Sequence, residues 1–552
     1  MLAFVLLLIV RLACAKYSII PDCDEVFNYW EPLHYITHGF GRQTWEYSPE
    51  YAIRSWVYVA LHSAVIQALE LFSLSKVDLF YGLRFFFAIV SAMAEYRLYC
   101  SIRRNLSRHS GVWYLLFSGL STGMFHASVS FLPSSFAMHM FTFGLADFLN
   151  YFQPHRPSSA IVRGVLWTAV GGLVGWPFSL VLVLPFGLCY GINSLVKVEL
   201  GPLVRTAVRI LLGVASVVLL LGALDSMAYQ KVVLVPLNIV LYNVVHADAT
   251  TGPDIFGVEP WHYYVANLVM NFNVVFCFAI VAPIAVLIPI GSGDFRVSRS
   301  KLLLATSPFL LWLSIFIAQP HKEERFMYVV YQSLCLNGAL AVEVARQVVV
   351  RVVDVPIVTR AFTLGVLAVF AVTSVLRSTA LAVFYGAPTE VYAVLSSPNV
   401  SGNVCVGREW YRFPSSYFLN DNTRIQFIKS GFSGLLPGEF EEATPSEWWW
   451  NRQGTRVIPK GMNNKNQEDP SKYVSVDQCD YVVDTSLPVD EEVGEQQFTD
   501  TWAKVYCGQF LNSAESRGIG RILYLPQALQ RLSGTQLQWT DYCIVEKVPK
   551  RN

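Results

Sequence analysis

The dominant feature of this 552-residue chain is the alternation of long apolar segments with short polar loops. An apolar stretch of about 20 residues can cross the hydrocarbon core of a bilayer as a helix. Counting the apolar N-terminal segment 1–20, eleven such stretches predict a polytopic α-helical membrane protein. The others lie at about 77–100, 112–131, 134–152, 160–176, 177–192, 205–224, 263–291, 303–318, 327–345 and 358–385. The pair that meets at Gly175-Trp176-Pro177 could instead be one bent segment.

The basic residues of the loops predict the orientation of the chain. With eleven spans, five loops rich in arginine and lysine fall on one side, and the positive-inside rule makes that side cytosolic. Residues 21–76, the loop 225–262, the junction around His321 and everything after about 386 then share the opposite side. The basic residues are Arg103, Arg104, Arg108, Arg156, Arg163, Lys197, Arg205, Arg209, Arg296, Arg299, Lys301, Arg346 and Arg351.

Two N-terminal segments allow more than one interpretation. Ala13-Cys14-Ala15 resembles a signal-peptidase site, so a cleaved signal peptide is an alternative to a first span. Residues 53–74 repeat apolar side chains at helical spacing, but Arg54, His62 and Glu70 make this stretch a poor span. We expect a helix that lies in the membrane interface.

Composition excludes several functions. The chain is 53% hydrophobic and 15% charged, whereas soluble proteins average about 25% charged residues. Its net charge of +1 provides no basic field for nucleic acid. The sequence contains no P-loop, no dinucleotide fingerprint and no paired CxxC, so nucleotide and structural zinc sites lack support.

The tail 386–552 contains no further predicted span. Short alternating stretches, such as 472–476 and 542–548, predict a small, mostly β domain. Four of its residues are Cys405, Cys479, Cys507 and Cys543, which could form two disulfides in any of three pairings. The predicted organisation is therefore a transmembrane domain 1–385, which includes the loop 21–76, followed by a domain 386–552.

The loop 21–76 begins with an unusual cluster of acids. Asp22, Asp24, Glu25 and Glu31 fall within ten positions, directly after the first apolar segment. Carboxylates at a membrane boundary are costly unless they face water, a partner or a substrate. The cluster therefore indicates an acid/base site at the mouth of a membrane protein.

A second charged cluster occupies the junction 319–326, between two predicted spans. It contains His321, Lys322 and Arg325 together with two glutamates. A solvated loop whose charges pair with one another is the simplest interpretation. These cations, however, lie on the side opposite the basic loops, and binding of an anion such as a lipid phosphate explains them.

The two clusters together indicate glycosyl transfer from a lipid-phosphate sugar to a hydroxyl. A carboxylate at the water interface can accept a proton from an alcohol, and nearby cations can stabilise charge on a departing phosphate. The aromatic-rich loop could stack on sugars, and the lipid tail could rest among the spans.

The motifs also resemble those of a known family. The stretches 22–35 (DCDEVFNYWEPLHY) and 43–55 (QTWEYSPEYAIRS) resemble the first luminal loop of an endoplasmic-reticulum mannosyltransferase, and 321–326 (HKEERF) resembles the signature of glycosyltransferase family 22. The stretches 252–254, 257–261 and 405–416 also match. Within the family, the resemblance is to dolichyl-phosphate-mannose-dependent α-1,2-mannosyltransferases of asparagine-linked glycosylation, which add the seventh and ninth mannoses to the lipid-linked oligosaccharide.

This resemblance implies a GT-C fold in the endoplasmic-reticulum membrane, with the active site in the first luminal loop. It also implies an inverting reaction with one catalytic base, for which Asp24 is the candidate, and with Glu25 or Asp22 as orienting groups. A structural pairing of Glu25 or Asp22 with Arg54 or Lys322 is the alternative. The donor phosphate would bind His321, Lys322, Arg325 and Arg54, and the acceptor would contact Trp30, Glu31, Tyr47, Glu259 and Trp261.

The resemblance implies no cofactor and no metal, although a carboxylate pair holding Mg²⁺ or Mn²⁺ is an alternative. Its implied partners are dolichyl-phosphate-mannose as donor, a dolichyl-diphosphate oligosaccharide as acceptor, and the lipids of the membrane. Two other functions stay open: mannosyl transfer to a glycosylphosphatidylinositol precursor or another branch, and transport of a lipid-linked sugar.

Overall fold

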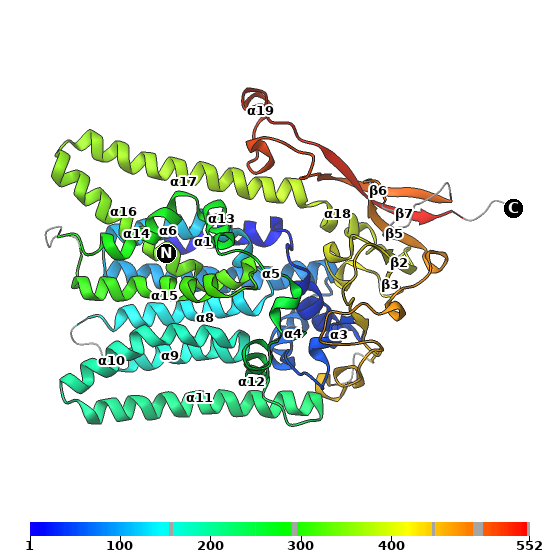
Figure 1. The fold of residues 1–552 in the computed structure, drawn as a ribbon, viewed down its shortest axis with the longest axis horizontal. Helices are drawn as coiled ribbons and strands as arrows, with labels where there is room; N and C mark the ends of the chain where they lie inside the picture. The colour runs from blue at the N-terminus through cyan, green and yellow to red at the C-terminus, as the bar shows by residue number, and fades with distance from the viewer. Residues whose placement is uncertain (154–157, 249, 290–294, 444–447, 490–500, 549–552) are drawn as a thin grey trace.

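The computed structural model describes residues 1–153, 158–248, 250–289, 295–443, 448–489 and 501–548. Long helices run side by side in one bundle, and a small sheet covers one end of it (Figure 1). The bundle helices are α1 (Leu2–Tyr17), α5 (Lys76–Asn105), α6 (Arg108–Leu120), α7 (Thr122–Ala127), α8 (Pro133–Asn150), α9 (Ser159–Val170), α10 (Leu184–Val196), α11 (Leu200–Tyr229), α13 (His262–Phe272), α14 (Val274–Ala285), α15 (Arg299–Ala318), α16 (Tyr331–Val353) and α17 (Pro356–Tyr385).

The polytopic architecture is confirmed, but fewer helices than predicted can span a bilayer by length and composition alone. Among the described residues, six continuous helical segments qualify, or seven if the pair α13 and α14, bent by 115°, is one span. The other predicted spans contain shorter helices. For example, α1 has 16 residues, and the stretch 112–131 is divided into α6 and α7 at Ser121.

The chain is also broken around Gly175-Trp176-Pro177. A π-helical turn (Gly171–Gly175) follows α9, and a 3₁₀ segment (Pro177–Val183) leads into α10. Trp176 has an extended backbone between them, because proline disfavours a helical conformation for the residue before it.

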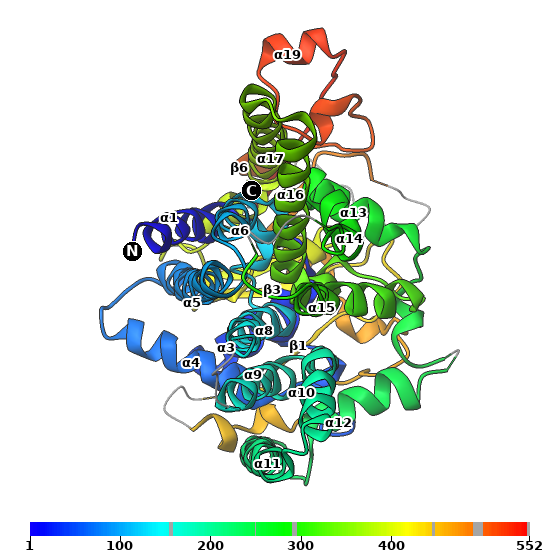
Figure 2. The same cartoon turned by 90° about the vertical axis from the view of Figure 1, so that its left-hand side faces the viewer.

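The predicted basic loops gather at one end of the bundle. The Arg296 guanidinium donates to the carbonyl of Arg104 at 2.9 Å, and Lys301 Nζ donates to the carbonyl of Phe152 at 2.5 Å. These bonds join the last turn of α5 to the segment before α15, and the segment just after α8 to the first turn of α15. The α10–α11 and α16–α17 turns lie at the same end (Figures 1 and 2).

The first helix belongs to the bundle through a buried ion pair. Arg11 Nε lies 2.7 Å from Glu95 Oε1 of α5, and Arg11 Nη2 donates to the carbonyl of Ser118 at 2.7 Å. Both charged side chains are almost fully buried. Because an unpaired charge would be very costly here, this pair ties α1 to α5 and α6.

The opposite end of the bundle carries the loop 21–76 and the C-terminal region. Its helices are α2 (Cys23–Glu25), α3 (Glu31–His38), α4 (Trp56–Glu70), α12 (Val235–Val240), α18 (Ala387–Val394) and α19 (Gln527–Leu532). The helix predicted within 53–74 is α4.

The C-terminal region contains a mixed five-stranded sheet of order β3-β2-β5-β7-β6. The strands are β2 (Gly402–Val406), β3 (Thr423–Phe427), β5 (Tyr481–Thr485), β6 (Trp502–Leu511) and β7 (Trp539–Lys547). The alternating stretch 542–548 belongs largely to β7. The prediction of a strand at 472–476 is wrong, because this stretch lies between two 3₁₀ turns and makes one isolated bridge, between Tyr473 and Phe427.

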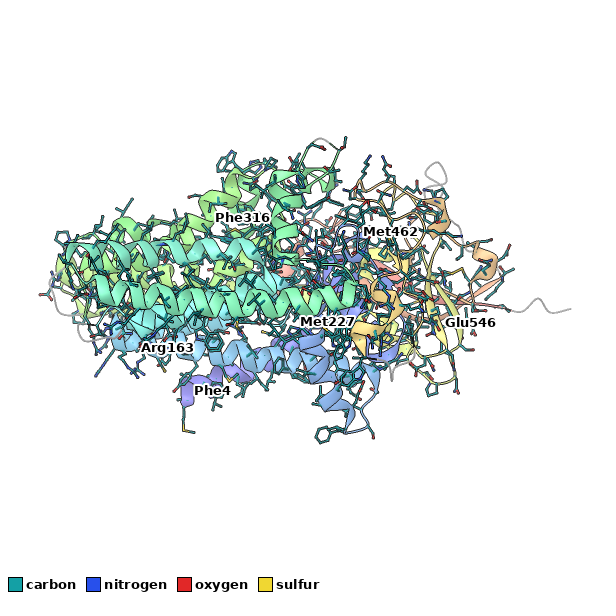
Figure 3. The ribbon with its side chains drawn as sticks, turned by 90° about the horizontal axis from the view of Figure 1, so that it is seen from below. Phe4, Arg163, Met227, Phe316, Met462 and Glu546 are labelled. Atoms are coloured by element: carbon teal, nitrogen blue, oxygen red, sulfur yellow. A yellow bond between two sulfur atoms is a disulfide. The ribbon has the colours of Figure 1, made fainter. Side chains whose placement is uncertain are left out.

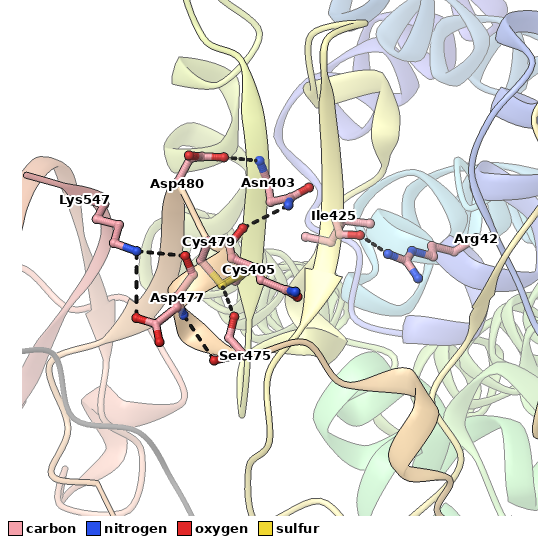
Figure 4. Close-up of a disulfide and its surroundings, with 10 residues drawn as sticks. Arg42, Asn403, Cys405, Ile425, Ser475, Asp477, Cys479, Asp480 and Lys547 are labelled. Atoms are coloured by element: carbon pink, nitrogen blue, oxygen red, sulfur yellow. Dashed lines mark hydrogen bonds and ion pairs between the residues drawn. A yellow bond between two sulfur atoms is a disulfide. The ribbon is translucent and has the colours of Figure 1, made fainter. Parts of the chain in front are cut away.

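Two disulfides hold this sheet together. Cys405 of β2 pairs with Cys479, which precedes β5 (Figure 4), and Cys507 pairs with Cys543 across β6 and β7. The structure thus selects one of the three possible pairings.

The loop 21–76 and the C-terminal region pack together. Strand β1 (Arg42–Gln43) pairs antiparallel with β4 (Gly438–Glu439), and Arg42 Nη2 lies 2.9 Å from the Glu439 carboxylate. Thr37 of α3 hydrogen-bonds Tyr417 at 3.0 Å. The C-terminal region therefore forms one wall around the acidic loop.

Candidate active site

The site begins where α1 ends and the short helix α2 starts. Asp22 is the N-cap of α2, and its Oδ1 accepts the backbone N–H of Asp24 at 2.9 Å. An aspartate at an N-cap satisfies backbone donors that the helix leaves free. This turn directs the carboxylates of Asp22 and Asp24 toward the same guanidinium.

That guanidinium belongs to Arg325, in the 3₁₀ turn Glu324–Val330 before α16. Arg325 Nη1 lies 3.0 Å from both carboxylate oxygens of Asp22, and Arg325 Nη2 lies 2.6 Å from Asp24 Oδ2. The carboxylate of Glu323 also pairs with Arg325. The structure thus brings together the two charged clusters that the sequence separates.

Exposure distinguishes the members of this cluster. The side chain of Asp24 is 36% exposed, whereas that of Asp22 is 23% exposed and that of Arg325 is 14% exposed. Asp24 is therefore the carboxylate of the pair that is more open to a reactant.

The two aspartates differ in pKa. Burial raises the pKa of Asp22 to about 7 against the opposing effect of Arg325, with a further contribution from the charge of Asp24. For Asp24, burial is outweighed by Arg325 and Arg54, which lower its pKa below the ordinary value. Asp24 is consequently ionised at neutral pH, whereas Asp22 gains and loses its proton around neutral pH.

His321 lies beside this cluster. Its Nδ1 is 2.6 Å from the carbonyl of Gly257, and its Nε2 is 3.1 Å from Glu323 Oε1. Burial lowers the pKa of His321, but the Glu323 carboxylate outweighs it, so the pKa is raised. His321 can therefore add positive charge next to Arg325.

Lys322 differs from its expected role. Its ammonium donates to the carbonyls of Glu259 at 2.9 Å and Pro320 at 3.4 Å, and it also bonds the carbonyl of Gln319. The residue is 6% exposed. With its donors turned to carbonyls, Lys322 joins the loops 257–260 and 319–322 and does not point at the aspartates.

Arg54 lies near Asp24 but is paired with another acid. Its Nε and Nη2 donate to the Glu46 carboxylate at 3.0 Å and 2.7 Å. Arg54 and Tyr29 also line a pocket that continues along aliphatic side chains, among them Leu173 and Val235. This pocket combines a cation with an apolar wall.

The end of α11 holds the backbone around Arg54. Asp225 Oδ2 accepts from Ser55 Oγ at 2.9 Å, and Asp225 Oδ1 accepts from the N–H of Val57 at 3.2 Å. Tyr229 donates its hydroxyl to the carbonyl of Arg54 at 2.6 Å. Asp225 is thus an acidic cap for α4, brought in from a helix distant in the sequence.

Glu25 is turned away from the cluster. It is 2% exposed, and its Oε1 accepts from Trp30 Nε1 at 3.1 Å and from the N–H of Phe131 at 2.9 Å. Burial raises its pKa. Neither Glu25 nor Asp22 pairs with Arg54 or Lys322 within the described residues; Glu25 instead joins the acidic loop to the start of α8.

Three expected acceptor contacts are also internal. Trp30 and Glu31 are fully buried, and Tyr47 is 1% exposed. The Glu31 carboxylate accepts from the N–H of Ser416 and from its hydroxyl, which ties α3 to the C-terminal region. The expectation that these three side chains contact an acceptor is corrected, because they are sealed in the protein core.

Glu259 and Trp261 remain accessible. Glu259 is exposed, and Trp261 is 64% exposed. The N–H of Glu259 donates to the carbonyl of Pro320 at 3.0 Å, so this loop is attached to the segment that carries His321. Both side chains can meet a ligand beside the charged cluster.

A metal ion between the aspartates would compete with Arg325 for their carboxylates. Ligand atoms of Asp22, Cys23 and Asp24 lie within 4.8 Å of one another, which is close enough to hold an ion. The guanidinium of Arg325 already contacts both carboxylates.

Sequence reasoning missed Glu323, Glu46, Asp225 and Tyr229 as parts of the site. The HKEERF motif was the available signal for Glu323.

The helix bundle, with its charged site at one end, defines a polytopic membrane protein with the GT-C fold. The apo crystal structure of ArnT from Cupriavidus metallidurans is similar, with a TM-score of 0.50, 14% identity, and coverage of 83% of this chain and 88% of that chain. At this identity, the similarity shows the fold alone.

The family is shown by sequence. Residues 2–420 match the model of the Alg9-like mannosyltransferase family, and the chain belongs to that family. It is 38% identical to the α-1,2-mannosyltransferase alg9 of Schizosaccharomyces pombe (99% of this chain, 94% of the relative) and 36% identical to ALG9 of Homo sapiens (95% and 85%). The protein is therefore a membrane-embedded mannosyltransferase.

Proposed function

We propose that this protein transfers mannose from dolichyl-phosphate-mannose to a dolichyl-diphosphate-linked oligosaccharide, with formation of α-1,2 linkages and inversion at the anomeric carbon. The site would face the lumen of the endoplasmic reticulum. The relatives that are named α-1,2-mannosyltransferases support the linkage. The contact of Asp24 with Arg325 at 2.6 Å is the observation that carries the chemistry.

In this mechanism, Asp24 is the general base. It accepts the proton of an acceptor hydroxyl while the hydroxyl oxygen bonds to the anomeric carbon of mannose. The bond from that carbon to the phosphate oxygen breaks, and dolichyl phosphate leaves. Arg325 and His321 stabilise the negative charge of the leaving phosphate.

The ion pair between Asp24 and Arg325 couples donor binding to the basicity of Asp24. Without donor, Arg325 lowers the pKa of Asp24. A donor phosphate that engages Arg325 would weaken this pairing and make Asp24 a stronger base. The site thus becomes competent for proton transfer when the donor is in place.

The surrounding residues have supporting roles in the proposal. Arg54 lies at the polar end of a small pocket whose apolar wall includes Leu173 and Val235, and it would contact the donor phosphate. Glu259 and Trp261 would contact acceptor sugars. We assign residues 1–385 to the catalytic membrane domain, with its loop 21–76, and residues 386–552 to a luminal domain that supports this loop.

The other functions have weaker support. A GPI mannosyltransferase 3 of Drosophila melanogaster is 26% identical over 59% of this chain, far less coverage than the Alg9 relatives show. An assay with defined lipid-linked oligosaccharides and with glycosylphosphatidylinositol precursors separates the two acceptors. A transporter would move the lipid-linked sugar without forming a glycosidic bond.

The decisive variant is Asp24→Asn in the purified full-length protein. Loss of a general base lowers turnover by about 10²–10⁴-fold, and we expect this loss with unchanged expression and disulfides. Glu50→Gln, an exposed acid of the same loop, is the matched control and should keep full activity. Near-normal turnover of Asp24→Asn contradicts the assignment of the base.

Turnover of the unmodified protein should also survive a metal chelator, since Arg325 supplies the positive charge.

A further inference from the structure

Two groups of exposed apolar side chains lie on opposite flanks of the C-terminal region. The first is the tryptophan patch, Trp448–Trp450. The second is the apolar arm, residues 512–538, which extends from β6 to β7 and includes α19. In Figure 2, α11 and α19 lie at opposite edges of the molecule. Neither group contributes to the active site.

The tryptophan patch adjoins the end of a lipid-facing helix. Trp448 is 66% exposed and stacks on Trp450 with ring centroids 4.8 Å apart. The turn Trp449–Asn451 packs against α11, and Thr455 Oγ1 bonds the carbonyl of Ala228 at 2.8 Å. Figure 3 shows Met227, near the end of α11, beside this part of the C-terminal region.

The exposure and length of α11 indicate where the tryptophan patch lies relative to the bilayer. Only 6% of its apolar window is buried in the protein, so lipid must cover the rest. Its 30 residues correspond to about 45 Å, close to the full thickness of a bilayer with its headgroups. Its end at Tyr229 is therefore at headgroup depth, where tryptophan is favoured.

The apolar arm descends along α17 on the other flank. The N–H of Tyr524 donates to the carbonyl of Leu376 at 3.0 Å, and Arg377 Nη1 donates to the carbonyl of Ile522 at 3.1 Å. Leu376 lies nine residues before the end of α17 at Tyr385, or about 13 Å along the helix. The arm thus extends past the end of α17 toward the middle of this spanning helix, and so toward the bilayer.

The side chains of the arm suit this depth. Ile519 is 53% exposed, Leu529 is 48% exposed and Leu532 is 83% exposed. Exposed apolar side chains of this size are costly in water but stable at the acyl–headgroup boundary.

We propose that the C-terminal region is held on the bilayer surface at two places, by the tryptophan patch beside α11 and by the apolar arm beside α17. The partner at both places is the lipid headgroup and upper acyl region. This arrangement would keep the wall formed by the C-terminal region in place over the acidic loop. It does not depend on the identity of donor or acceptor.

Photo-crosslinking from single positions tests the proposal. Trp448, Leu532 and, as control, Val505 are each replaced by p-benzoylphenylalanine in the full-length protein, which is reconstituted in phosphatidylcholine nanodiscs. Val505 is 46% exposed on β6, at the register shift opposite Val545 and Ile544. The neighbouring Glu546 lies at the far end from the bundle in Figure 3. Intact mass reports whether a phospholipid is attached after irradiation.

Lipid adducts at positions 448 and 532, with none at 505, are the expected result. Absence of adducts at both test positions overturns the proposal, and an adduct at only one overturns the two-sided arrangement. Crosslinks from 448 or 532 to another polypeptide indicate a protein interface instead. Equal lipid labelling at 505 also overturns the proposal, because lipid contact is then not confined to the two places. Leu529 is a second position in the arm if the variant at 532 does not fold.

Discussion

Arg325 Nη2 lies 2.6 Å from Asp24 Oδ2, and the same guanidinium holds Asp22 at 3.0 Å. The aspartates follow the first bundle helix, whereas the arginine precedes α16. Their meeting produces a carboxylate that is ionised and partly exposed beside a cation that can bind phosphate. The consequences of this pairing can be tested by substitution.

Arg325→Lys should weaken donor use although it keeps the positive charge. Lysine cannot reproduce the planar fork that contacts two carboxylates at once. We expect kcat/KM for the donor to fall about 10- to 100-fold, as for loss of about 1.4–3 kcal/mol of binding. Arg424→Lys, which alters a more exposed arginine of the C-terminal region, is the control. An unchanged donor KM and kcat would remove Arg325 from the phosphate site.

Asp22 should give the reaction a pH dependence near neutrality. Its pKa is raised to about 7, so its ionised form increases above that pH and competes with the donor phosphate for Arg325. We expect the donor KM to rise above pH 7, and Asp22→Asn to abolish the rise. Steady-state kinetics from pH 5.5 to 8.5 measure both profiles. The same rise in Asp22→Asn would assign it to another group.

Lys322→Met should lower the stability of the protein more than it changes the KM for the donor. The methionine removes the hydrogen bonds from the ammonium to the carbonyls of Glu259 and Gln319, and a hydrogen bond from a charged group contributes about 1.5–3 kcal/mol. We expect a lower melting temperature and a larger effect on acceptor KM than on donor KM. A selective increase in donor KM at unchanged stability would instead favour a contact with phosphate.

Tyr229→Phe tests how Arg54 is positioned. The variant removes the 2.6 Å hydrogen bond to the carbonyl of Arg54 but keeps the ring. We expect kcat to fall several-fold, with an unfolding free energy lower by about 1 kcal/mol. Asp225→Asn should show the same pattern. Tyr190→Phe, which removes a hydroxyl bond elsewhere in the bundle, should leave kcat unchanged.

The Cys405–Cys479 disulfide should be a major support of the C-terminal region. It joins residues 74 positions apart, and closure of a loop of this length stabilises a fold by about 4.5 kcal/mol in the chain-entropy model. The double variant Cys405→Ser/Cys479→Ser should increase protease sensitivity of the region 386–552. Substitution of the exposed Cys277 is the control, and equal sensitivity of both variants would contradict this role.

Much of the architecture could be predicted from local sequence. Bilayer crossing depends on the length and polarity of contiguous segments, so the polytopic class follows from the apolar stretches. Hydropathy does not reveal breaks such as Ser121 or the bend at Asn273, so several predicted spans contain two shorter or bent helices. The charged motifs at 22–25 and 321–326 likewise indicated the site region without showing that they touch.

Only the tertiary structure separated reactive from structural members of those motifs. Asp24 and Glu25 are neighbours in sequence, yet a helical turn points one at Arg325 and the other at the N–H of Phe131. Lys322 and Arg325 are both cations of one short motif, but only Arg325 faces the aspartates. The sequence by itself determined the membrane class, the family and the chemical groups available. The roles of these groups depend on burial and distance, which long-range packing sets.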